Sequence, residues 1–390
     1  MDATRRTQSA VLLDRSVKVP MLALLLTCGA ALGVPASTHA QSAAAGIDPK
    51  SPKPPKKPKE PKEPKPSGEE QVPELFRTDA PLALTFTTNI KQLRRDKTEN
   101  PPWRWAALSY QDSAKGAVQI PLRVHTRGFW RLKSCTFPPV RMNFSDKETK
   151  HTLFHDLEKP KLVNYCRDTD SYEQYILQEL QLYRVYQQLT PVSHRVRLAK
   201  LAYVDSANGK REAERYAIIV EDPERLARRH SAQVIKLKGA GADDLDHPQL
   251  ALAYLFQYFI GNLDFSFSGL HNTELIGTSD GRILPVAYDF DFAGAVNASY
   301  ATPPPDYQMR SVRIRRFLGS CAVAAEYPAA LARFLEKKEA IYGLYRDEIG
   351  KRMDPGVVRE TLAYFDDFYD AVRTPEAARR NVFDSCVKPH

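Results

Sequence analysis

The sequence predicts an α+β protein whose first half is rich in strands and carries one long helix, and whose second half is mainly helical. Two observations support this order. Apolar and polar residues alternate with a period of two in several segments between residues 82 and 220. The segment 171–189 and most segments after residue 224 instead place their apolar residues on one helical face. We therefore expect a β-rich lobe over residues 81–222 and a helical lobe over residues 223–390.

The first lobe is expected to contain six strands and one long helix. The helix over 171–189 ends at Thr190-Pro191, because proline cannot continue a helix. Asn208-Gly209 is a strong turn signal and predicts a hairpin between the last two strands. The expected strands cover residues 82–88, 118–125, 140–144, 160–165, 196–204 and 215–220.

The second lobe is expected to contain helices and one β-hairpin. The segment 247–261 is apolar on nearly every side, which indicates a buried core helix. A turn at Ser279-Asp280-Gly281 joins the expected strands 273–276 and 283–288. The other expected helices cover residues 224–229, 328–345 and 357–372.

Composition excludes several classes of protein. The 390 residues are 43% hydrophobic and 26% charged, which is typical of a globular chain and not of a disordered one. The net charge of +9 is concentrated in residues 49–66, which hold seven Lys, two Glu and eight Pro. The charge of the remaining chain is too small to indicate a nucleic-acid partner.

The N-terminal residues predict export. Basic residues precede the apolar run 21–26, and small residues lead to Ala40, as in a secretory signal peptide. We expect residues 1–40 to be removed, which would place the chain in the periplasm, in the cell envelope or outside the cell. Cys28 leaves lipid anchoring open as an alternative. Residues 41–80 are expected to form an extended Pro/Lys-rich linker, whose charge would allow weak contact with an anionic envelope surface.

The cysteines fit an oxidising compartment. After removal of residues 1–40 the chain keeps four, an even number. Neighbours in sequence suggest the pairs Cys135–Cys166 and Cys321–Cys386, although three pairings are possible and four free thiols remain an alternative. Their spacing does not match a zinc site.

Acidic residues and an asparagine surround the predicted hairpin of the second lobe. Asp264 follows the apolar helix, Asn272 precedes the first strand, and Asp289 and Asp291 follow the second strand. Charged groups in such apolar surroundings are costly unless they are paired or bind a cation. Carboxylate and amide oxygens suit Mg²⁺, and a further carboxylate would accept a proton from a hydroxyl nucleophile. Phosphoryl transfer needs this set of groups. The alternative interpretation of these residues is structural: Asp264 would cap a helix, and Asp289 and Asp291 would flank a turn.

With these residues the sequence resembles the spore coat protein H (CotH-type) kinase-like family, over residues 118–295. The acidic motifs carry most of this likeness. Weaker likenesses are Arg127-Gly128 with Lys133, the strand at Lys161, and the segment 216–222 that ends in Glu221-Asp222. The resemblance implies a two-lobed protein-kinase-like fold, Mg²⁺, and ATP or another nucleotide. The chain has no glycine-rich phosphate loop of the G-x-G-x-x-G kind.

The resemblance also implies roles for single residues. Asp264 would be the catalytic base, Asn272 and Asp289 would bind Mg²⁺, and Asp291 would lie beside them or bind a second metal ion. Lys161 would contact the nucleotide phosphates and form an ion pair with Glu179. Other candidates for the nucleotide site are Arg127, Lys133 and Glu221.

Three functions are compatible with this pattern. The first is an exported kinase that transfers phosphate to a protein hydroxyl, its acceptor unknown. The second is a non-catalytic envelope module that keeps the kinase-like fold for binding. The third is a glycosidase that uses two of the carboxylates, for which Trp103, Trp105 and Trp130 would supply aromatic surface.

Export predicts a mature protein that begins near Gln41 and contains disulfides. Intact-mass analysis after thiol alkylation without reduction should show no alkylated cysteine in protein purified from the envelope. Four alkylated thiols would contradict the prediction.

Overall fold

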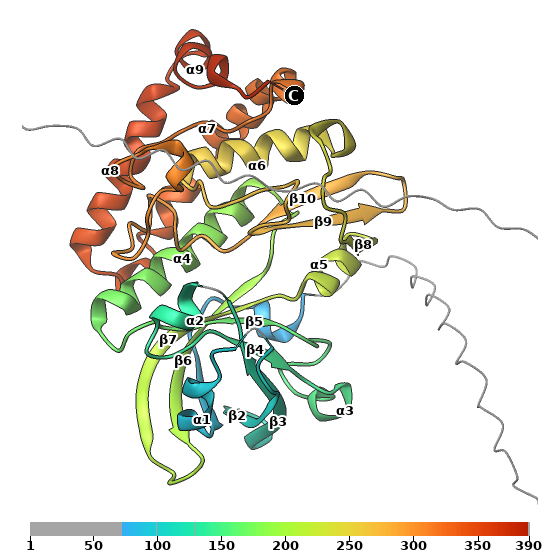
Figure 1. The fold of residues 1–390 in the computed structure, drawn as a ribbon, viewed down its shortest axis with the longest axis vertical. Coiled ribbons are helices and arrows are strands. Elements are labelled where there is room, and N and C mark those ends of the chain that lie inside the picture. Colours follow the sequence, from blue (N-terminus) through green and yellow to red (C-terminus); the bar gives the residue numbers. More distant parts are fainter. Residues whose placement is uncertain (1–71, 99, 129, 389–390) are drawn as a thin grey trace, which may run out of the picture. The chain divides into compact units, whose positions relative to one another are not determined.

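The computed structural model describes residues 72–98, 100–128 and 130–388, which hold two β-sheets and a set of helices (Figure 1). The expected signal peptide, Cys28 and residues 41–71 of the expected linker lie outside the described residues. In the described part no helix is long and apolar enough to cross a membrane.

The first sheet is a closed barrel of seven strands within the described residues. Its order is β1-β2-β3-β4-β5-β7-β6, and β6 closes the ring by pairing in parallel with β1. All other neighbours in the barrel are antiparallel. The strands are β1 (Leu82–Thr88), β2 (Arg104–Asp112), β3 (Gly116–Thr126), β4 (Val140–Asn143), β5 (Lys161–Val163), β6 (Val196–Asp205) and β7 (Arg211–Val220).

The barrel overturns the predicted two-lobed kinase-like fold. The closing pair runs from Leu82 opposite Ala199 to Thr88 opposite Asp205. The ring therefore has no free edge strand, because its first strand is hydrogen-bonded to its sixth. Hydrophobic periodicity within a segment predicts that it is a strand, but does not indicate which distant strand it pairs with. The six expected strands are confirmed, whereas β2 was not predicted.

Inward-facing side chains fill the barrel. Phe86, Ile120 and Tyr203 are completely buried, and Phe137 packs edge-on against Tyr203 at a ring-centroid distance of 4.7 Å. The strands alternate between this interior and the outer surface, as their period of two requires. Outward-facing Trp105 is 70% exposed, so β2 carries apolar residues on both faces. Its sequence therefore lacks a clear apolar–polar alternation, although its burial alternates.

Five of the nine α-helices in the described residues follow the last barrel strand in sequence, and the other four lie between barrel strands. The predicted helices are confirmed to within three residues at each end, and α1, α2, α3 and α9 were not predicted. The bounds are α1 (Ile90–Arg95), α2 (Trp130–Ser134), α3 (Asp146–Thr149), α4 (Asp170–Leu189), α5 (Pro223–Arg229), α6 (His247–Ile260), α7 (Tyr327–Leu344), α8 (Pro355–Ala371) and α9 (Pro375–Asn381). Short 3₁₀ turns are η1 (Glu74–Phe76), η2 (Ala242–Asp244), η3 (Pro305–Tyr307), η4 (Cys321–Glu326), η5 (Gly350–Arg352) and η6 (Phe383–Ser385).

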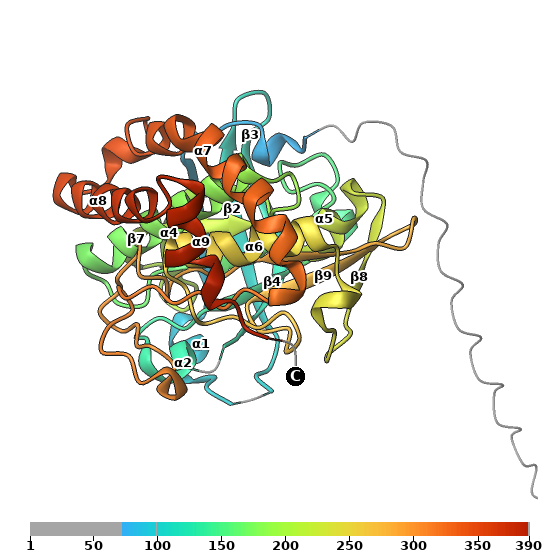
Figure 2. The same cartoon turned by 90° about the horizontal axis from the view of Figure 1, so that it is seen from above.

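Helices α4 and α6 form the centre of the second hydrophobic core. Helix α6 contacts α4, α7 and β10, and in Figure 2 it lies among the other helices. Phe256 stacks on Tyr186 of α4 at 4.4 Å, and Phe259 stacks on Phe365 of α8 at 4.3 Å. The prediction that 247–261 is a core helix is therefore confirmed.

The second sheet has the order β10-β9-β8. Its strands are β8 (Ala232–Ile235), β9 (Thr273–Thr278) and β10 (Ile283–Ala287). The predicted hairpin is formed by β9 and β10, with Thr273 opposite Ala287 at its open end. Strand β8, which sequence analysis did not predict, pairs with β9 on the other side.

Two disulfides are present, and both predicted pairs are confirmed. Cys135–Cys166 joins the residue after α2 to the segment between β5 and α4. Cys321–Cys386 joins η4 to the segment that follows η6.

The end of α6 gives a test of the packing that leads to Asp264. Gly261 caps the helix at φ +67°, and a Cβ atom there would collide with the Tyr364 hydroxyl. We expect Gly261→Ala to lose about 1 kcal/mol through backbone strain and a further ~1–3 kcal/mol through overpacking. Gly281→Ala is the matched control, because Gly281 has φ +88° and open space around it. Urea denaturation should show the smaller loss in the control, and equal losses would contradict this packing.

Candidate functional site

The β9–β10 hairpin brings two predicted metal ligands to its open end. Asn272 precedes β9 and Asp289 follows Tyr288 at the end of β10, and the Tyr288 amide donates to the Asn272 carbonyl at 3.1 Å. Asn272 has φ +50° and Asp289 has φ +65°. Non-glycine residues rarely adopt this left-handed conformation, and such positions cluster at functional sites.

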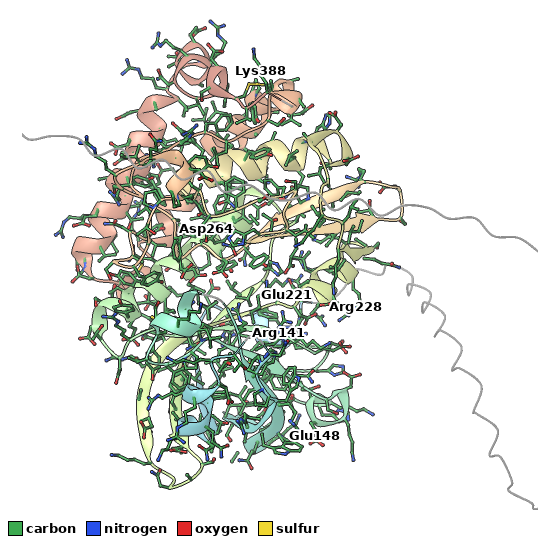
Figure 3. All side chains as sticks on the ribbon, viewed as in Figure 1. Arg141, Glu148, Glu221, Arg228, Asp264 and Lys388 are labelled. Atoms are coloured by element: carbon green, nitrogen blue, oxygen red, sulfur yellow. A yellow bond between two sulfur atoms is a disulfide. The ribbon has the colours of Figure 1, made fainter. Side chains whose placement is uncertain are left out.

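Asp264 lies beside Asn272, as the sequence predicted. The Asn272 side-chain amide donates to Asp264 Oδ2 at 3.0 Å and to the Asp264 carbonyl at 2.7 Å. His271 Nε2 lies 2.8 Å from Asp264 Oδ1. The Asp264 side chain, labelled in Figure 3, is 35% exposed and so is accessible to solvent while its neighbours fix its orientation.

One face of α4 holds the chain directly after β10. The Asp289 amide donates to the Tyr183 hydroxyl at 2.9 Å. The Phe290 amide stabilises the ionised Glu179 carboxylate and so opposes the rise of its pKa. Glu179 and Tyr183 are four residues apart and therefore lie on the same helical face. Helix α4 thus fixes the backbone from which Asp289 and Asp291 extend.

Glu179, Asp289 and Asp291 form an acidic cluster. Burial and then the charge of Asp289 raise the pKa of Asp291 to about 7. Burial, followed by the charges of Asp291 and Asp289, raises the pKa of Glu179 well above its usual value. Glu179 is 1% exposed, and its Oε1 atom has no hydrogen-bond partner among the described residues. The surroundings therefore favour the protonated forms of Glu179 and Asp291 in the absence of a cation.

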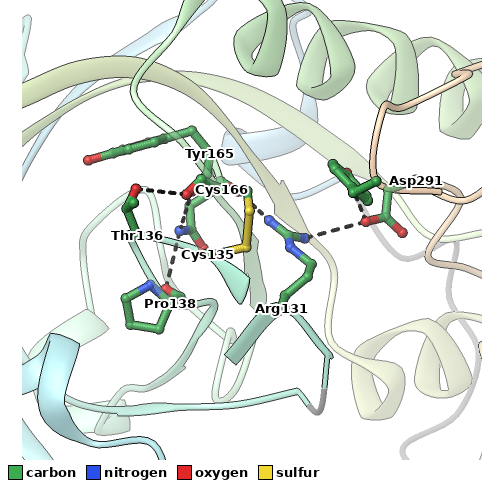
Figure 4. Close-up of a disulfide and its surroundings, with 9 residues drawn as sticks. Arg131, Cys135, Thr136, Pro138, Tyr165, Cys166 and Asp291 are labelled. Carbon is green, nitrogen blue, oxygen red and sulfur yellow. Dashed lines mark hydrogen bonds and ion pairs between the residues drawn. A yellow bond between two sulfur atoms is a disulfide. The ribbon is translucent and has the colours of Figure 1, made fainter. Parts of the chain in front are cut away.

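Arg131 reaches this cluster from α2, and sequence analysis did not select it. Its Nη1 atom lies 3.9 Å from Asp291 Oδ2. Figure 4 marks this ion pair with a dashed line. Its charge opposes the rise in the pKa of both Asp291 and Glu179. The Tyr300 hydroxyl donates to the same Asp291 oxygen at 3.0 Å. No local signal marked Arg131, because Asp291 is distant in sequence.

Lys161 does not pair with Glu179, and that prediction is wrong. Its Nζ atom lies 2.9 Å from Glu274 Oε1, and His194 Nε2 lies 3.2 Å from Glu274 Oε2. Burial opposes ionisation of Glu274, but Lys161 and His194 outweigh it and lower the pKa of Glu274 to about 2. The ammonium group also lies 3.1 Å from the centre of the Tyr288 ring. Glu274 is on β9, far from Lys161 in sequence, so only the folded hairpin reveals this pair.

The other predicted nucleotide contacts lie in different surroundings. Arg127 is half-buried, influences the pKa of Lys161, and has a buried Nε atom without a hydrogen-bond partner in the described part of the chain. Lys133 is exposed on α2. Glu221, also labelled in Figure 3, is completely buried and accepts from the Arg229 side chain at 3.2 Å and the Arg195 amide at 3.1 Å. Glu221 thereby fixes the turn after β7.

The aromatic surface considered for a glycosidase lies on the barrel. Trp103 packs edge-on against His125 at 4.2 Å, and Trp105 stacks against the Arg123 guanidinium at 4.4 Å. The side chain of Trp130 lies outside the described part. The two described tryptophans thus contact barrel residues.

The acidic cluster offers oxygen atoms that suit a magnesium ion. Within residues 72–98, 100–128 and 130–388, no three His, Cys, Asp or Glu side chains are spaced so as to hold a metal. Mg²⁺ is commonly bound by only one or two carboxylates, with water and substrate phosphates completing its shell. The donor set of Asp289, Asp291 and the Asn272 amide has this chemistry, and the unpartnered Glu179 oxygen lies in the same cluster.

Comparisons with protein-family models, with curated proteins and with solved structures find no significant match to this chain. The resemblance to the CotH-type family therefore stays an expectation from sequence, and the interpretation of the site rests on its own residues.

The raised pKa of Asp291 gives a pH test in metal-free protein. Between pH ~4 and ~7 the unfolded carboxyl ionises while the native one stays protonated, so this group makes wild-type stability fall as the pH rises. Asn does not titrate. We expect Asp291→Asn to gain more than about 1 kcal/mol relative to wild type between about pH 5 and about pH 8, measured by urea denaturation with a chelator present.

Exposed Asp280 is the control for this experiment. Hydrogen bonds from Thr278 and Arg282 lower its pKa, so this carboxyl is ionised in both the folded and the unfolded state above about pH 5. The stability difference between Asp280→Asn and wild type should therefore not change between about pH 5 and about pH 8. A pH-independent difference between Asp291→Asn and wild type would contradict the assignment for Asp291.

Proposed function

We propose that the acidic cluster binds Mg²⁺ together with ATP or another nucleotide, and that the chain transfers the terminal phosphate to a protein hydroxyl outside the cytoplasm. The observation that carries this proposal is the cluster of two buried carboxyl groups, Glu179 and Asp291, with half-buried Asp289, in which burial and neighbouring charge oppose ionisation in the absence of a cation. Buried charges of one sign are stabilised by a bound cation. The proposal rests on this site and not on the fold, because one chemistry occurs on many folds.

Two basic residues near Asp289, Lys161 and Arg127, favour a phosphate-bearing ligand. The Asp289 carboxylate acts on the pKa of Lys161, so the basic and acidic groups are close enough to interact. Arg127 acts on the pKa of Lys161 as well. Its Nε atom, which has no hydrogen-bond partner among the described residues, suits an anionic oxygen. A cation site next to a pair of basic side chains is what a metal–phosphate complex requires.

Asp264 is suited to the role of base. Hydrogen bonds with His271 and Asn272 fix its carboxylate, yet a third of the side chain remains accessible. An acceptor hydroxyl that enters from solvent could give its proton to this carboxylate as the new O–P bond forms. Bound Mg²⁺ would neutralise charge on the phosphates, and Asn272, Asp289 and Asp291 are the residues that would hold it.

Export remains part of the proposal, as does weak contact of residues 49–66 with an anionic envelope surface. The alternative is an envelope module that binds the nucleotide without turnover. Both share the cation site, so only a transfer assay separates them.

Two substitutions separate metal binding from base catalysis. Asp289→Asn should abolish Mg²⁺-dependent nucleotide binding and transfer together, because it removes a charged ligand. Asparagine is chosen because it tolerates the left-handed backbone at this position. Asp264→Asn should spare nucleotide affinity but lower transfer ~10²–10⁴-fold, the usual contribution of a general base.

The measurements are calorimetry with Mg²⁺-nucleotide and transfer of labelled phosphate to envelope extract, with Asp280→Asn as the control that should behave as wild type. Unchanged nucleotide affinity in Asp289→Asn would refute the metal site. Full-rate transfer by Asp264→Asn would refute the base. Binding without transfer by the wild type would support the non-catalytic module.

A further inference from the structure

We propose that Arg131 is a positioning residue of the acidic site and that the Cys135–Cys166 disulfide holds it there, so that the site is complete only in the oxidised protein. This inference deepens the proposed function, and the part that concerns activity rests on that proposed function. The structural part, a mechanical link from the disulfide through Arg131 to the chain after β10, can be tested without metal or nucleotide.

The helix that carries Arg131 is too short to hold its own position. Helix α2 spans only Trp130–Ser134, and isolated helices of this length are unstable. Cys135 follows the helix directly, and its amide donates to the Arg131 carbonyl at 3.0 Å. A restraint on Cys135 therefore acts on the same helical turn that carries Arg131.

The segment around Cys166 supplies this restraint. Besides the disulfide, the Cys166 carbonyl accepts from the Thr136 amide at 3.0 Å and from the Thr136 hydroxyl at 3.0 Å. Arg131 NH2 donates to the Asn164 carbonyl, two residues before Cys166. Figure 4 shows the disulfide and Arg131 side by side, with Asp291 beyond the guanidinium. The end of α2 is thus tied to the 164–166 segment by a covalent bond and by the Arg131 side chain.

Arg131 connects α2 and the 164–166 segment, which the disulfide joins, to the acidic cluster. Its side chain is 13% exposed, and its charge is placed beside Asp291, 3.9 Å from one oxygen. Fixing Arg131 in one position costs conformational entropy of both its backbone and its side chain. The disulfide already restrains the backbone, so it reduces the backbone part of this cost. A guanidinium fixed at this distance neutralises part of the cluster and keeps the 289–291 segment in place.

The test is hydrogen–deuterium exchange on metal-free protein, followed in peptides that cover 287–295 and 130–137. The proteins are wild type, Cys135→Ser/Cys166→Ser, Arg131→Met, the variant with all three changes, and Arg131→Lys. Cys321→Ser/Cys386→Ser is the matched control, because it removes the other disulfide of the described chain. Circular dichroism establishes that each protein is folded.

We expect exchange in 287–295 to become about tenfold faster when either the Cys135–Cys166 pair or Arg131 is removed. The two effects should not add in the combined variant, because both remove the same link. Arg131→Lys should restore part of the protection, and the control should leave 287–295 unchanged. Unchanged exchange in this peptide after loss of the disulfide, or additive effects in the combined variant, would overturn the proposal.

A phosphine provides a second route if the serine variant does not fold. It reduces the disulfide of folded wild-type protein to two thiols, with two electrons from the phosphine and two protons from water, and itself becomes the phosphine oxide. The 287–295 peptide should then exchange faster in wild type and show no further increase in Arg131→Met. Unchanged exchange in Arg131→Met alone also overturns the proposal.

Transfer activity separates this inference from the proposed function. Arg131→Met and the serine pair should each lower transfer at least about tenfold, without multiplying in the combined variant and with partial recovery in Arg131→Lys. Absence of transfer in wild type would be a failure of the proposed function alone, because the exchange measurements still decide the role of the disulfide. Full transfer activity in Arg131→Met would contradict the proposed role of Arg131 in the reaction.

Discussion

The site depends on the contact between one face of α4 and the chain that leaves β10. Tyr183 and Glu179 hold the Asp289 and Phe290 amides, and both side chains are buried. Helix α4 also packs against β6 and β7 of the barrel and against α6 and α7. The residues that position the acidic cluster are therefore anchored in a helix that packs against both the barrel and the other helices. A cluster of like charges remains fixed there because the surrounding core cannot relax at low cost.

Two electrostatic environments meet at Asp289. On one side, burial and the charge of Asp289 raise the pKa of Asp291, and burial and the charges of both aspartates raise the pKa of Glu179. The charge of Arg131 acts on all three carboxyl groups. On the other side Lys161 and His194 surround the ionised Glu274. The carboxyl cluster favours a cation, and the group around Glu274 places basic side chains near that cation site. This arrangement suits a metal–phosphate complex better than a neutral ligand, which would leave the buried charges uncompensated.

The sequence predicts those features of this protein that depend on local pattern. Local periodicity predicts the apolar helix, and a turn signal predicts the β9–β10 hairpin. Asp264 and Asn272 lie between these two elements, so their proximity also follows from a stretch of some forty residues. Barrel closure does not follow, because β1 and β6 are joined by a pairing that no local pattern encodes. Lys161 was assigned to Glu179 instead of Glu274, and Arg131 was overlooked, for the same reason: both contacts form only when distant segments pack.

The central claim is that the acidic cluster is a cation site, and anomalous diffraction from crystals soaked in Mn²⁺ tests it most directly. Mn²⁺ accepts the same oxygen ligands as Mg²⁺ and scatters anomalously. The account predicts one strong anomalous peak within coordinating distance of Asp289 and at least one of Asp291, Asn272 and Glu179, lost in crystals of Asp289→Asn. A map without a peak there at a Mn²⁺ concentration that saturates binding in solution, or a peak that survives Asp289→Asn, would contradict it.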